Sequence, residues 1–421
     1  MKKKENKSLI LLLLIIIIVL LGFNYSKKNN LKKENSNSIN IYDYYNKYVK
    51  TNKETNLYNK NNEKVGKVGK SVELELEELE ELEDSNSSGL FKINNLEGNY
   101  YIKYTDIEAI DSLTIVNDRY KNYIVFNESI ITNDSTEFYD DNNNLIYSLK
   151  KSFEFPIIIK YDDKYGIEFN NRLLYIKSSN VKEIKESINT DKKNSSGVGV
   201  LNYHAFYDEN NLEEKKNCVT TICHSKSQFK SHLDLFKEEN ILTITMSEME
   251  MYIDGNIQLP KSVLITIDDG PKTNHAVDLL KEYKMNATIF LVTSWFDKND
   301  YYTNEYIEFH SHTHNMHEVG DCPGGQGGGI KCLEENVIQE DLKKSREKLN
   351  NTTAIAYPFY EYNEYSIKML KQAGFTMAFV GESSNSDNLV HVDSDKFRLK
   401  RFVIVTYTTI KDLKNYFNQI K

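Results

Sequence analysis

The pattern of apolar and polar positions divides the chain into three regions. Residues 9–21 form an unbroken apolar run that follows three consecutive lysines near the start of the chain. Short segments in which every second position is apolar, separated by Asn, Asp and Gly, occupy residues 41–186 and predict β strands. From residue 198 to residue 421, apolar strand-like segments alternate with stretches whose apolar positions have helical spacing. This alternation predicts an α/β domain built on a parallel sheet, either a barrel or an open sheet.

The first region, residues 1–40, predicts a membrane helix followed by a polar stalk. A helix over residues 9–23 would be about 22 Å long at ~1.5 Å per residue, so it needs flanking residues to cross a hydrocarbon core of roughly 30 Å. The residues after the run contain no small-x-small cleavage site, which favours an uncleaved anchor over a cleaved signal peptide. The lysines are expected to stay in the cytoplasm. We therefore expect a single-pass cell-membrane protein whose remainder is extracellular, or a secreted protein if the signal is cleaved.

The second region contains a weak internal repeat. Leu57-Tyr58 recurs as Phe138-Tyr139, and residues 101–103 recur as residues 175–177, each within short alternating segments. The repeat predicts two small all-β modules, over residues 41–112 and 113–186. A polar stretch at residues 187–197 predicts a linker to the third region, residues 198–421.

The third region is expected to hold its own core. Its pattern predicts strands at residues 198–203, 241–245, 263–267 and 287–292, and a helix whose buried face carries Ala276, Leu279, Leu280 and Tyr283. The full chain of 421 residues is long enough for several domains, because one core rarely grows beyond about 250 residues. Its net charge of -9 disfavours nucleic acid as a partner.

The four cysteines fall into two close pairs, Cys218 with Cys223 and Cys322 with Cys332. In an exported chain these pairs favour local disulfides, although four cysteines permit three connectivities. Neither pair has the C-x-x-C spacing of zinc ribbons. The second pair brackets a glycine-rich segment, residues 320–332, which is interpreted either as part of a substrate cleft or as a plain surface loop.

Two segments carry candidate metal chemistry. The strand at residues 263–267 runs into Asp268 and Asp269, and adjacent side chains on an extended backbone point to opposite sides. One carboxylate can then bind a metal while the other acts as a base; an acidic turn that caps the next helix is the alternative. Two histidines with one carboxylate would leave a coordination position for water, as in catalytic metal sites. The histidines of the second segment are His310, His312, His314 and His317, four of the nine in the chain.

Residues 266–271, 311–317 and 356–359 resemble, in this order, three motifs of the polysaccharide deacetylases, the NodB-like members of carbohydrate esterase family 4. The likeness covers residues 198–421 and implies a distorted (β/α) barrel as the catalytic domain. The five-residue step from His312 to His317 is similar to the branch that deacetylates poly-N-acetylglucosamine. This likeness selects His312 and His317 as metal ligands. The rival pair, His310 and His314, would satisfy the four-residue step of many other relatives.

The resemblance implies a role for each residue of the site. One divalent metal, Zn²⁺ first and Ni²⁺, Co²⁺ or Fe²⁺ as alternatives, would be bound by Asp269, His312 and His317. Asp268 would be the base that takes a proton from the attacking water. The last two roles fall to the backbone N–H of Phe359, as oxyanion donor, and to His204, as the acid that protonates the leaving amine.

Two departures from the family pattern affect these roles. The late Leu-x-His motif that supplies the acid in many relatives is absent, since residues 402–407 read Phe-Val-Ile-Val-Thr-Tyr. His204 is the candidate because residues 201–204 resemble the early acid segment of the poly-N-acetylglucosamine branch. Ala356 stands where the family usually has an arginine. The resemblance therefore does not say what orients Asp268, and a low activity would be consistent with this change.

The β modules resemble tandem bacterial SH3-like domains, which commonly bind cell-wall polymers. Together with the third region they imply a membrane-anchored extracellular hydrolase that removes N-acetyl groups from an aminosugar polymer. Peptidoglycan and poly-β-1,6-N-acetylglucosamine are both open as substrates. The alternatives are a catalytically weak wall-binding scaffold and a hydrolase for a different amide or ester.

Overall fold

A computed structural model describes most of the chain beyond residue 43. The described residues are 44–78, 89–94, 96, 98–114, 118–187, 194–296, 301–381 and 388–420. The predicted anchor and stalk, residues 1–40, and most of the predicted linker at residues 187–197 lie outside these ranges. Within these ranges, no helix has the length and apolar character needed to cross a bilayer. The chain divides into two compact units, Met1–Thr114 and Ile115–Lys421.

The first unit contains short antiparallel strands. They are β1 (Tyr48–Thr51), β2 (Thr55–Tyr58), β3 (Lys64–Val68), β4 (Glu73–Glu75), β5 (Leu90–Lys92), β6 (Tyr101–Lys103) and β7 (Ile107–Ala109). β1 pairs with β4 and β7, and β2 pairs with β3 and β6. β6 also pairs with β5. Alternate positions of these strands are buried, as the period-two pattern predicts.

The second unit begins with strands that repeat this pairing scheme. They are β8 (Glu128–Thr132), β9 (Thr136–Tyr139), β10 (Leu145–Leu149), β11 (Glu154–Pro156), β12 (Ile159–Lys160), β13 (Lys164–Phe169), β14 (Arg172–Lys177) and β15 (Val181–Glu186). β8 pairs with β11 and β15, as β1 does with β4 and β7, and β9 pairs with β10 and β14, as β2 does with β3 and β6. Tyr58 lies opposite Tyr101, and Tyr139 lies opposite Tyr175. The repeat in the sequence thus corresponds to one pairing scheme used twice, whereas the likeness to SH3-like domains stays a prediction.

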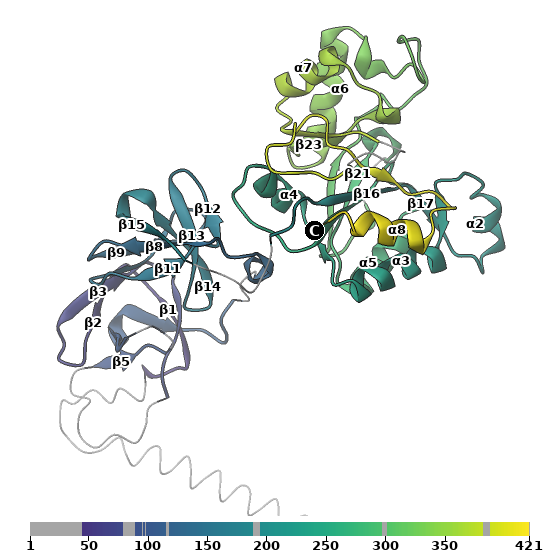
Figure 1. The fold of residues 1–421 in the computed structure, drawn as a ribbon. Coiled ribbons are helices and arrows are strands. Elements are labelled where there is room, and N and C mark those ends of the chain that lie inside the picture. Colours follow the sequence, from purple (N-terminus) through teal and green to yellow (C-terminus); the bar gives the residue numbers. More distant parts are fainter. Residues whose placement is uncertain are drawn as a thin grey trace, which may run out of the picture. The chain divides into compact units, whose positions relative to one another are not determined.

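Parallel strands then alternate with helices (Figure 1). The strands are β16 (Gly199–Tyr203), β17 (Ala205–Tyr207), β18 (Cys223–Ser225), β19 (Leu242–Thr243), β20 (Ser262–Ile267), β21 (Ala287–Leu291), β22 (Ile307–Ser311), β23 (Ala354–Ala356), β24 (Met377–Phe379) and β25 (Phe402–Val403). The helices are α2 (Leu212–Lys216), α3 (Lys226–Glu238), α4 (Met246–Ile253), α5 (Asn274–Tyr283), α6 (Glu335–Lys348), α7 (Glu364–Gln372) and α8 (Ile410–Phe417). In the main sheet the order is β24-β23-β22-β21-β20-β16-β25, with β19 beside β20. The predicted α/β architecture with a parallel sheet is confirmed.

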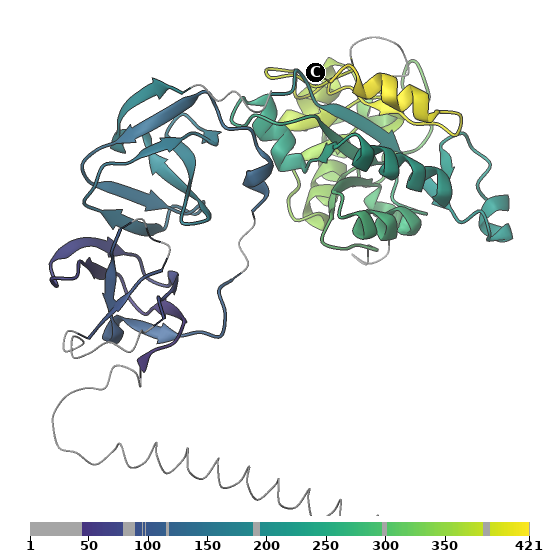
Figure 2. The same cartoon turned by 60° about the horizontal axis from the view of Figure 1, so that its bottom comes forward.

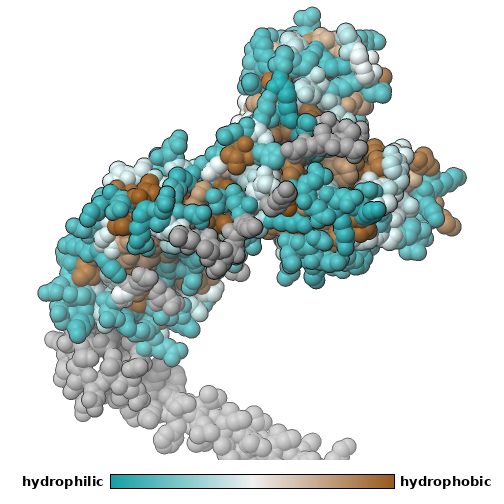
Figure 3. Space-filling model, viewed as in Figure 1, coloured by the Kyte–Doolittle hydropathy of each residue, from teal (hydrophilic) through white to brown (hydrophobic). Residues whose placement is uncertain are grey.

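Both faces of this sheet are buried. Leu201 and Ile265 pack with residues of α3, α5 and α8 on one face, and these three helices lie side by side in Figures 1 and 2. Val200 and Leu264, one position earlier, pack with residues of α4 on the other face. Burial on both faces explains why β20 reads as a continuous apolar run instead of alternating. The molecular face drawn in Figure 3 is mainly hydrophilic, with hydrophobic residues in small separate patches.

The two edges of the main sheet are linked by the segment that precedes β25. Leu399 forms a parallel bridge with Phe379 of β24, and β25 pairs with β16 at the opposite edge. The short segment from Leu399 to Phe402 therefore contacts both edge strands, which curls the sheet towards an incomplete barrel. Arg401 lies in this segment and is fully buried.

The second set of β strands packs against α4. Glu248 of α4 accepts hydrogen bonds from Arg119 Nε at 2.8 Å and from the Tyr123 hydroxyl at 2.9 Å. Both residues precede β8, and Tyr120 and Tyr123 belong to the same apolar cluster as the α4 face of the sheet. Glu248 also completes the N-terminal capping box of α4 with Thr245. A buried ion pair and shared apolar contacts thus fix these strands to the α/β part of the second unit.

Candidate active site

The two adjacent aspartates leave the end of β20 in different directions. The Asp268 N–H donates to Tyr203 O at 2.9 Å and so extends the pairing of β20 with β16. Asp269 then adopts φ 74° and Gly270 φ 104°. A Cβ atom on Gly270 would overlap Leu291 and Phe296, so only glycine fits this turn. Neither aspartate caps α5, whose N-cap residue is Thr273, so the helix-capping alternative is wrong.

His312 follows β22 and faces Asp269. Its N–H donates to Leu291 O at 2.8 Å, and its Nδ1 lies 2.8 Å from Ala356 O. The Nδ1 proton is therefore held by a carbonyl, which leaves Nε2 as the acceptor that a metal requires. The backbone carbonyl of Ala356 thus takes part in the site, although alanine stands at the position where the family motif usually has an arginine.

The turn from Thr313 to His317 brings the second histidine to the same place. The Asp341 carboxylate accepts the N–H groups of His314 and Asn315, each at 2.7 Å, and Thr313 has φ 71°. The carboxylate stabilises a turn that a continuing strand could not make. Because the chain reverses here, His317 lies beside His312 with ring centroids 4.7 Å apart.

The rival histidines point elsewhere. His310 Nδ1 lies 2.6 Å from Thr352 Oγ1, and His314 Nδ1 lies 2.9 Å from Thr293 Oγ1. In the part of the chain that the structure describes, neither belongs to a group of metal-binding side chains. The alternation of side chains along the strand thus does not determine which histidines come together. The turn after residue 312 determines it.

Asp269, His312 and His317 form the cluster in which one ion could contact three side chains. Nε2 of His312 and Nε2 of His317 lie 3.6 and 3.4 Å from Asp269 Oδ1. Ligand atoms about 2.1 Å from a shared tetrahedral zinc would be about 3.4 Å apart. Asp269 Oδ1 is buried and has no hydrogen-bond partner among the described residues. An oxygen left unsatisfied in this way fits a role as a metal ligand, since buried polar atoms otherwise find partners.

The ionisation of the cluster suits metal binding. Burial raises the pKa of Asp269 to about 6, and the charge of Asp268 contributes in the same direction. Burial lowers the pKa of His312 to about 3 and also lowers the pKa of His317. Both imidazoles are therefore neutral near pH 7, which is the form that binds a metal.

Asp268 is held by a residue that the sequence did not identify. Arg401 Nη1 and Nη2 donate to its two carboxylate oxygens at 2.7 and 2.8 Å, and both side chains are fully buried. Arg401 also donates to Thr266 Oγ1 and Val380 O. Burial alone would raise the pKa of Asp268, but the Arg401 charge holds it well below its usual range. Asp268 is therefore ionised and oriented without an arginine at position 356.

A single signal in the sequence pointed to Arg401. It precedes the apolar run at residues 402–405, so a charged side chain stands at the start of a predicted buried strand. Such a residue needs a charged partner, but nothing in the spacing says that the partner is Asp268. The pairing arises because the segment before β25 crosses between the two sheet edges.

His204 lies on the other side of Asp268. Its Nε2 is 4.0 Å from Asp268 Oδ2 and 3.4 Å from the Tyr360 hydroxyl. Burial lowers the pKa of His204, while the charges of Asp268 and Asp269 oppose this effect. His204 Nδ1 is buried without a partner among the described residues. The predicted base and the predicted acid are thus neighbours.

Phe359 and Trp295 complete the walls around His317. Phe359 has φ 56°, and its N–H donates to no group in the described part of the chain. Its ring centroid is 4.5 Å from that of His317, and the ring of Trp295 is 5.4 Å from the same imidazole. Trp295 is 46% exposed and is the only tryptophan of the chain.

The glycine-rich segment is held next to Phe359. Cys322 and Cys332 form a disulfide across it, and the other predicted pair, Cys218 with Cys223, is also bonded. Glu361 accepts hydrogen bonds from the Gly328 N–H at 2.9 Å and forms an ion pair with Lys331 at 2.7 Å. The loop is therefore anchored two residues from the predicted oxyanion donor, which favours the cleft over the plain surface loop.

A family model described as polysaccharide deacetylase matches residues 256–378. The chain contains a polysaccharide deacetylase domain. The match includes both aspartates after β20 and the histidines after β22. The predicted family and the enzyme class, a polysaccharide deacetylase, are therefore confirmed.

The deacetylase domain is similar to proteins named as N-deacetylases. The poly-beta-1,6-N-acetyl-D-glucosamine N-deacetylase of Staphylococcus epidermidis is 26% identical over 233 residues, which cover 48% of this chain and 78% of that protein. The protein of the same name from Staphylococcus aureus is 27% identical over 232 residues, covering 48% and 77%. A solved de-N-acetylase from Aggregatibacter actinomycetemcomitans matches 52% of this chain and 99% of its own, with 22% identity and a TM-score of 0.43.

Proposed function

We propose that this polysaccharide deacetylase is a metal-dependent hydrolase that removes N-acetyl groups from poly-β-1,6-N-acetylglucosamine. The observation that carries the proposal is the convergence of Asp269, His312 and His317 next to an ionised Asp268. The names of the staphylococcal relatives and the five-residue step between the histidines support this polymer over peptidoglycan. We also propose that the enzyme acts outside the cell, anchored by residues 9–23.

The donor set of the cluster fits one divalent cation. One carboxylate oxygen and two neutral imidazoles are suitable ligands for Zn²⁺, and also for Ni²⁺, Co²⁺ or Fe²⁺. The unsatisfied Asp269 Oδ1 supports this assignment. Bound there, such a cation would lower the pKa of a water molecule and polarise the acetyl carbonyl.

The other residues supply the proton transfers. Asp268, fixed by Arg401, takes a proton as water adds to the amide carbon. The Phe359 N–H donates to no group among the described residues, so it can donate to the oxygen that gains negative charge. His204 gives a proton to the nitrogen as the C–N bond breaks, which yields acetate and a free amine. His204 must be protonated for this step; burial lowers its pKa, and the Asp268 carboxylate 4.0 Å away opposes that effect and favours the protonated form.

Acetate release tests the reaction and the substrate. The purified chain is incubated with poly-β-1,6-N-acetylglucosamine, with peptidoglycan and with an acetylated sugar ester. We expect acetate from the first polymer and loss of the activity with a chelator. Turnover of the ester alone would show that the chain is an esterase. No acetate release with any added metal would favour the alternative function, a wall-binding scaffold.

Matched histidine variants test the ligand set. His317→Gln is expected to lose metal binding and activity, whereas His314→Gln keeps both, because its ring contacts Thr293 instead. Trp295 is the only tryptophan of the chain and lies against His317. Quenching of its fluorescence by Co²⁺, reversed by Zn²⁺, therefore reports metal binding at the cluster directly. If His314→Gln loses the response and His317→Gln keeps it, the assignment is wrong.

A further inference from the structure

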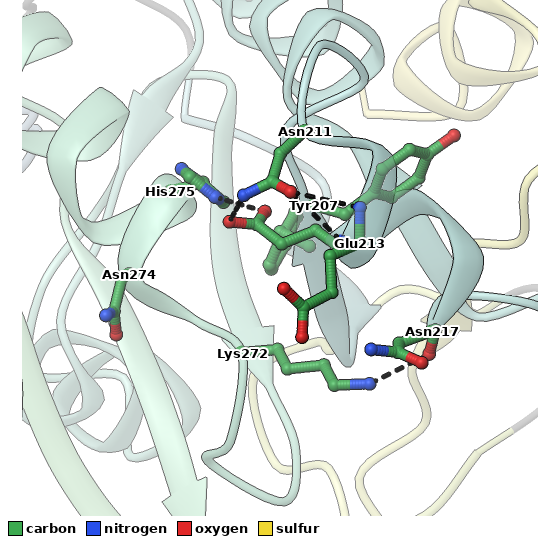
Figure 4. Close-up of a pocket in the computed structure, with 9 residues that line it drawn as sticks. Tyr207, Asn211, Glu213, Asn217, Lys272, Asn274 and His275 are labelled. Atoms are coloured by element: carbon green, nitrogen blue, oxygen red, sulfur yellow. Dashed lines mark hydrogen bonds and ion pairs between the residues drawn. The ribbon is translucent and has the colours of Figure 1, made fainter.

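A cavity of about 380 Å³ lies beside the loops that carry the site. Its walls come from the segment after β17, from α2 and from the turn that follows Pro271 (Figure 4). The residues used below are Tyr207, Asn211, Glu213, Asn217, Lys272 and His275, all of which line it. None of them has a role in the reaction described above.

One side of the cavity is a fixed hydrogen-bond network. The Glu214 carboxylate accepts from the Asp208 N–H at 2.8 Å and from Asn211 Nδ2 at 2.9 Å, and His275 Nε2 lies 2.7 Å away. The Cys218–Cys223 disulfide closes the same segment. The cavity wall is therefore pre-formed, which lowers the ordering cost of binding a ligand.

Other polar groups in the cavity remain available. The Glu213 carboxylate has no hydrogen-bond or ion-pair partner among the described residues. Lys272 Nζ donates to Asn217 O at 3.0 Å and keeps further N–H groups for a ligand. Figure 4 shows the side chains of Glu213 and Lys272 close to each other, whereas the ring of Tyr207 points away from both. A carboxylate that accepts and an amine that donates together suit a sugar unit, whose hydroxyls both donate and accept.

The cavity adjoins the catalytic residues along the chain. The Phe206 N–H donates to Lys272 O at 2.9 Å, so two of the segments that line the cavity are hydrogen-bonded to each other. Phe206 is two residues after His204, and Lys272 is three residues after Asp269. Three extended residues span at most about 11 Å. The backbone of Lys272, on one wall of the cavity, therefore lies within about 11 Å of Asp269, a distance that about two sugar units can span.

We propose that this cavity is a subsite for a neighbouring N-acetylhexosamine unit of the polymer, with Glu213 accepting from its hydroxyls and Lys272 donating to them. The proposal rests on the proposed deacetylase function, because it assumes that the next unit of the chain is being hydrolysed. A subsite of this kind makes the enzyme prefer polymers and longer oligomers over single sugars.

Kinetics on oligomers of different length test the subsite. Glu213→Ala is expected to raise KM for a β-1,6-linked pentamer roughly three- to tenfold, as for loss of one partly solvated hydrogen bond, with kcat unchanged. KM for the monosaccharide should not change. Glu213→Gln, whose amide oxygen still accepts, should recover part of the effect. Glu282→Ala, an equal change at an exposed position of α5, is the control. An equal KM change at every length, or no change in Glu213→Ala, would overturn the subsite.

A binding measurement separates this proposal from the proposed function. Calorimetric titration of the pentamer is done in the Asp268→Asn background, with and without Glu213→Ala, so that no turnover is needed. Weaker pentamer binding in the double variant supports the subsite even if the wild-type chain releases no acetate. Equal binding overturns the subsite even if deacetylation is observed.

Discussion

The proposed metal-ligand cluster comes from two loops, the one after β20 and the one after β22, whereas Asp268, its ion-pair partner Arg401 and its neighbour His204 come from three separate places in the chain. Asp269, His312 and His317 are held by backbone geometry, including positive φ at Asp269, Gly270 and Thr313. Asp268 is held by a buried ion pair with Arg401 and has His204 as a neighbour. The first region is thus built from local motifs, and the second depends on how the sheet closes. The two should fail differently when they are mutated.

The largest effect is expected at the cluster, from Asp269→Asn. Asparagine keeps the size and tolerates positive φ, but it replaces a charged metal ligand with a neutral amide. Deacetylation should fall to the background rate, and the quenching of Trp295 by Co²⁺ should disappear. Retained activity together with a retained metal response would show that Asp269 is not a ligand.

Asp268→Asn should lower activity without weakening metal binding, which distinguishes the region around Asp268 from the metal-ligand cluster. Loss of a general base reduces kcat by about 10²–10⁴-fold, but the metal cluster does not include Asp268. Acetate release should therefore fall while the metal response of Trp295 remains. If metal binding is lost as well, the distinction between ligand and base is incorrect.

Arg401→Lys tests the ion pair that orients the base. Lysine keeps the charge but cannot make two parallel hydrogen bonds to one carboxylate. We expect kcat to fall by roughly 10–100-fold, the size seen when an orienting partner is changed. Because the Arg401 charge lowers the pKa of Asp268, a weaker pair should also move the acidic limb of the pH–rate profile to higher pH. A merely structural role would lower stability without this shift. Arg398→Lys, the same change at a partly exposed, ion-paired arginine three residues earlier, is the control.

The same contrast explains what the sequence could predict. Strands at residues 263–267 and 287–292 were predictable because a buried parallel strand is a continuous apolar run, and the structure has them as β20 and β21. Asp269, His312 and His317 could be chosen from motif spacing and family resemblance. Arg401 could not, because its contact with Asp268 spans 133 residues and depends on the curl of the sheet.

A smaller effect is expected at Phe359, the proposed oxyanion donor. Phe359→Gly keeps the N–H group and favours φ near 56°, so only the contact between its ring and His317 is lost. Activity should fall by less than about tenfold. Phe359→Val keeps an apolar side chain but disfavours positive φ, and it should fall further, towards the 10²-fold loss of an oxyanion donor. A larger loss in the glycine variant would mean that the ring, and not the backbone, is required.

The smallest expected effect is a pH-dependent change in the thermal stability of the metal-free protein. Native Asp269 has a pKa of about 6, whereas an unfolded aspartate has a pKa near 3.9. The folded state therefore disfavours the ionised form of Asp269. As the pH rises from about 4 to about 6, the contribution of this carboxyl to the free energy of unfolding becomes destabilising. Metal-free Asp269→Asn should match the wild-type Tm near pH 4 and exceed it by a few degrees above about pH 7. The neighbouring histidines titrate in both proteins and cancel in the difference. Thermal denaturation with a chelator measures it, and a Tm difference that is the same at both pH values would show that the buried carboxylate is not destabilising.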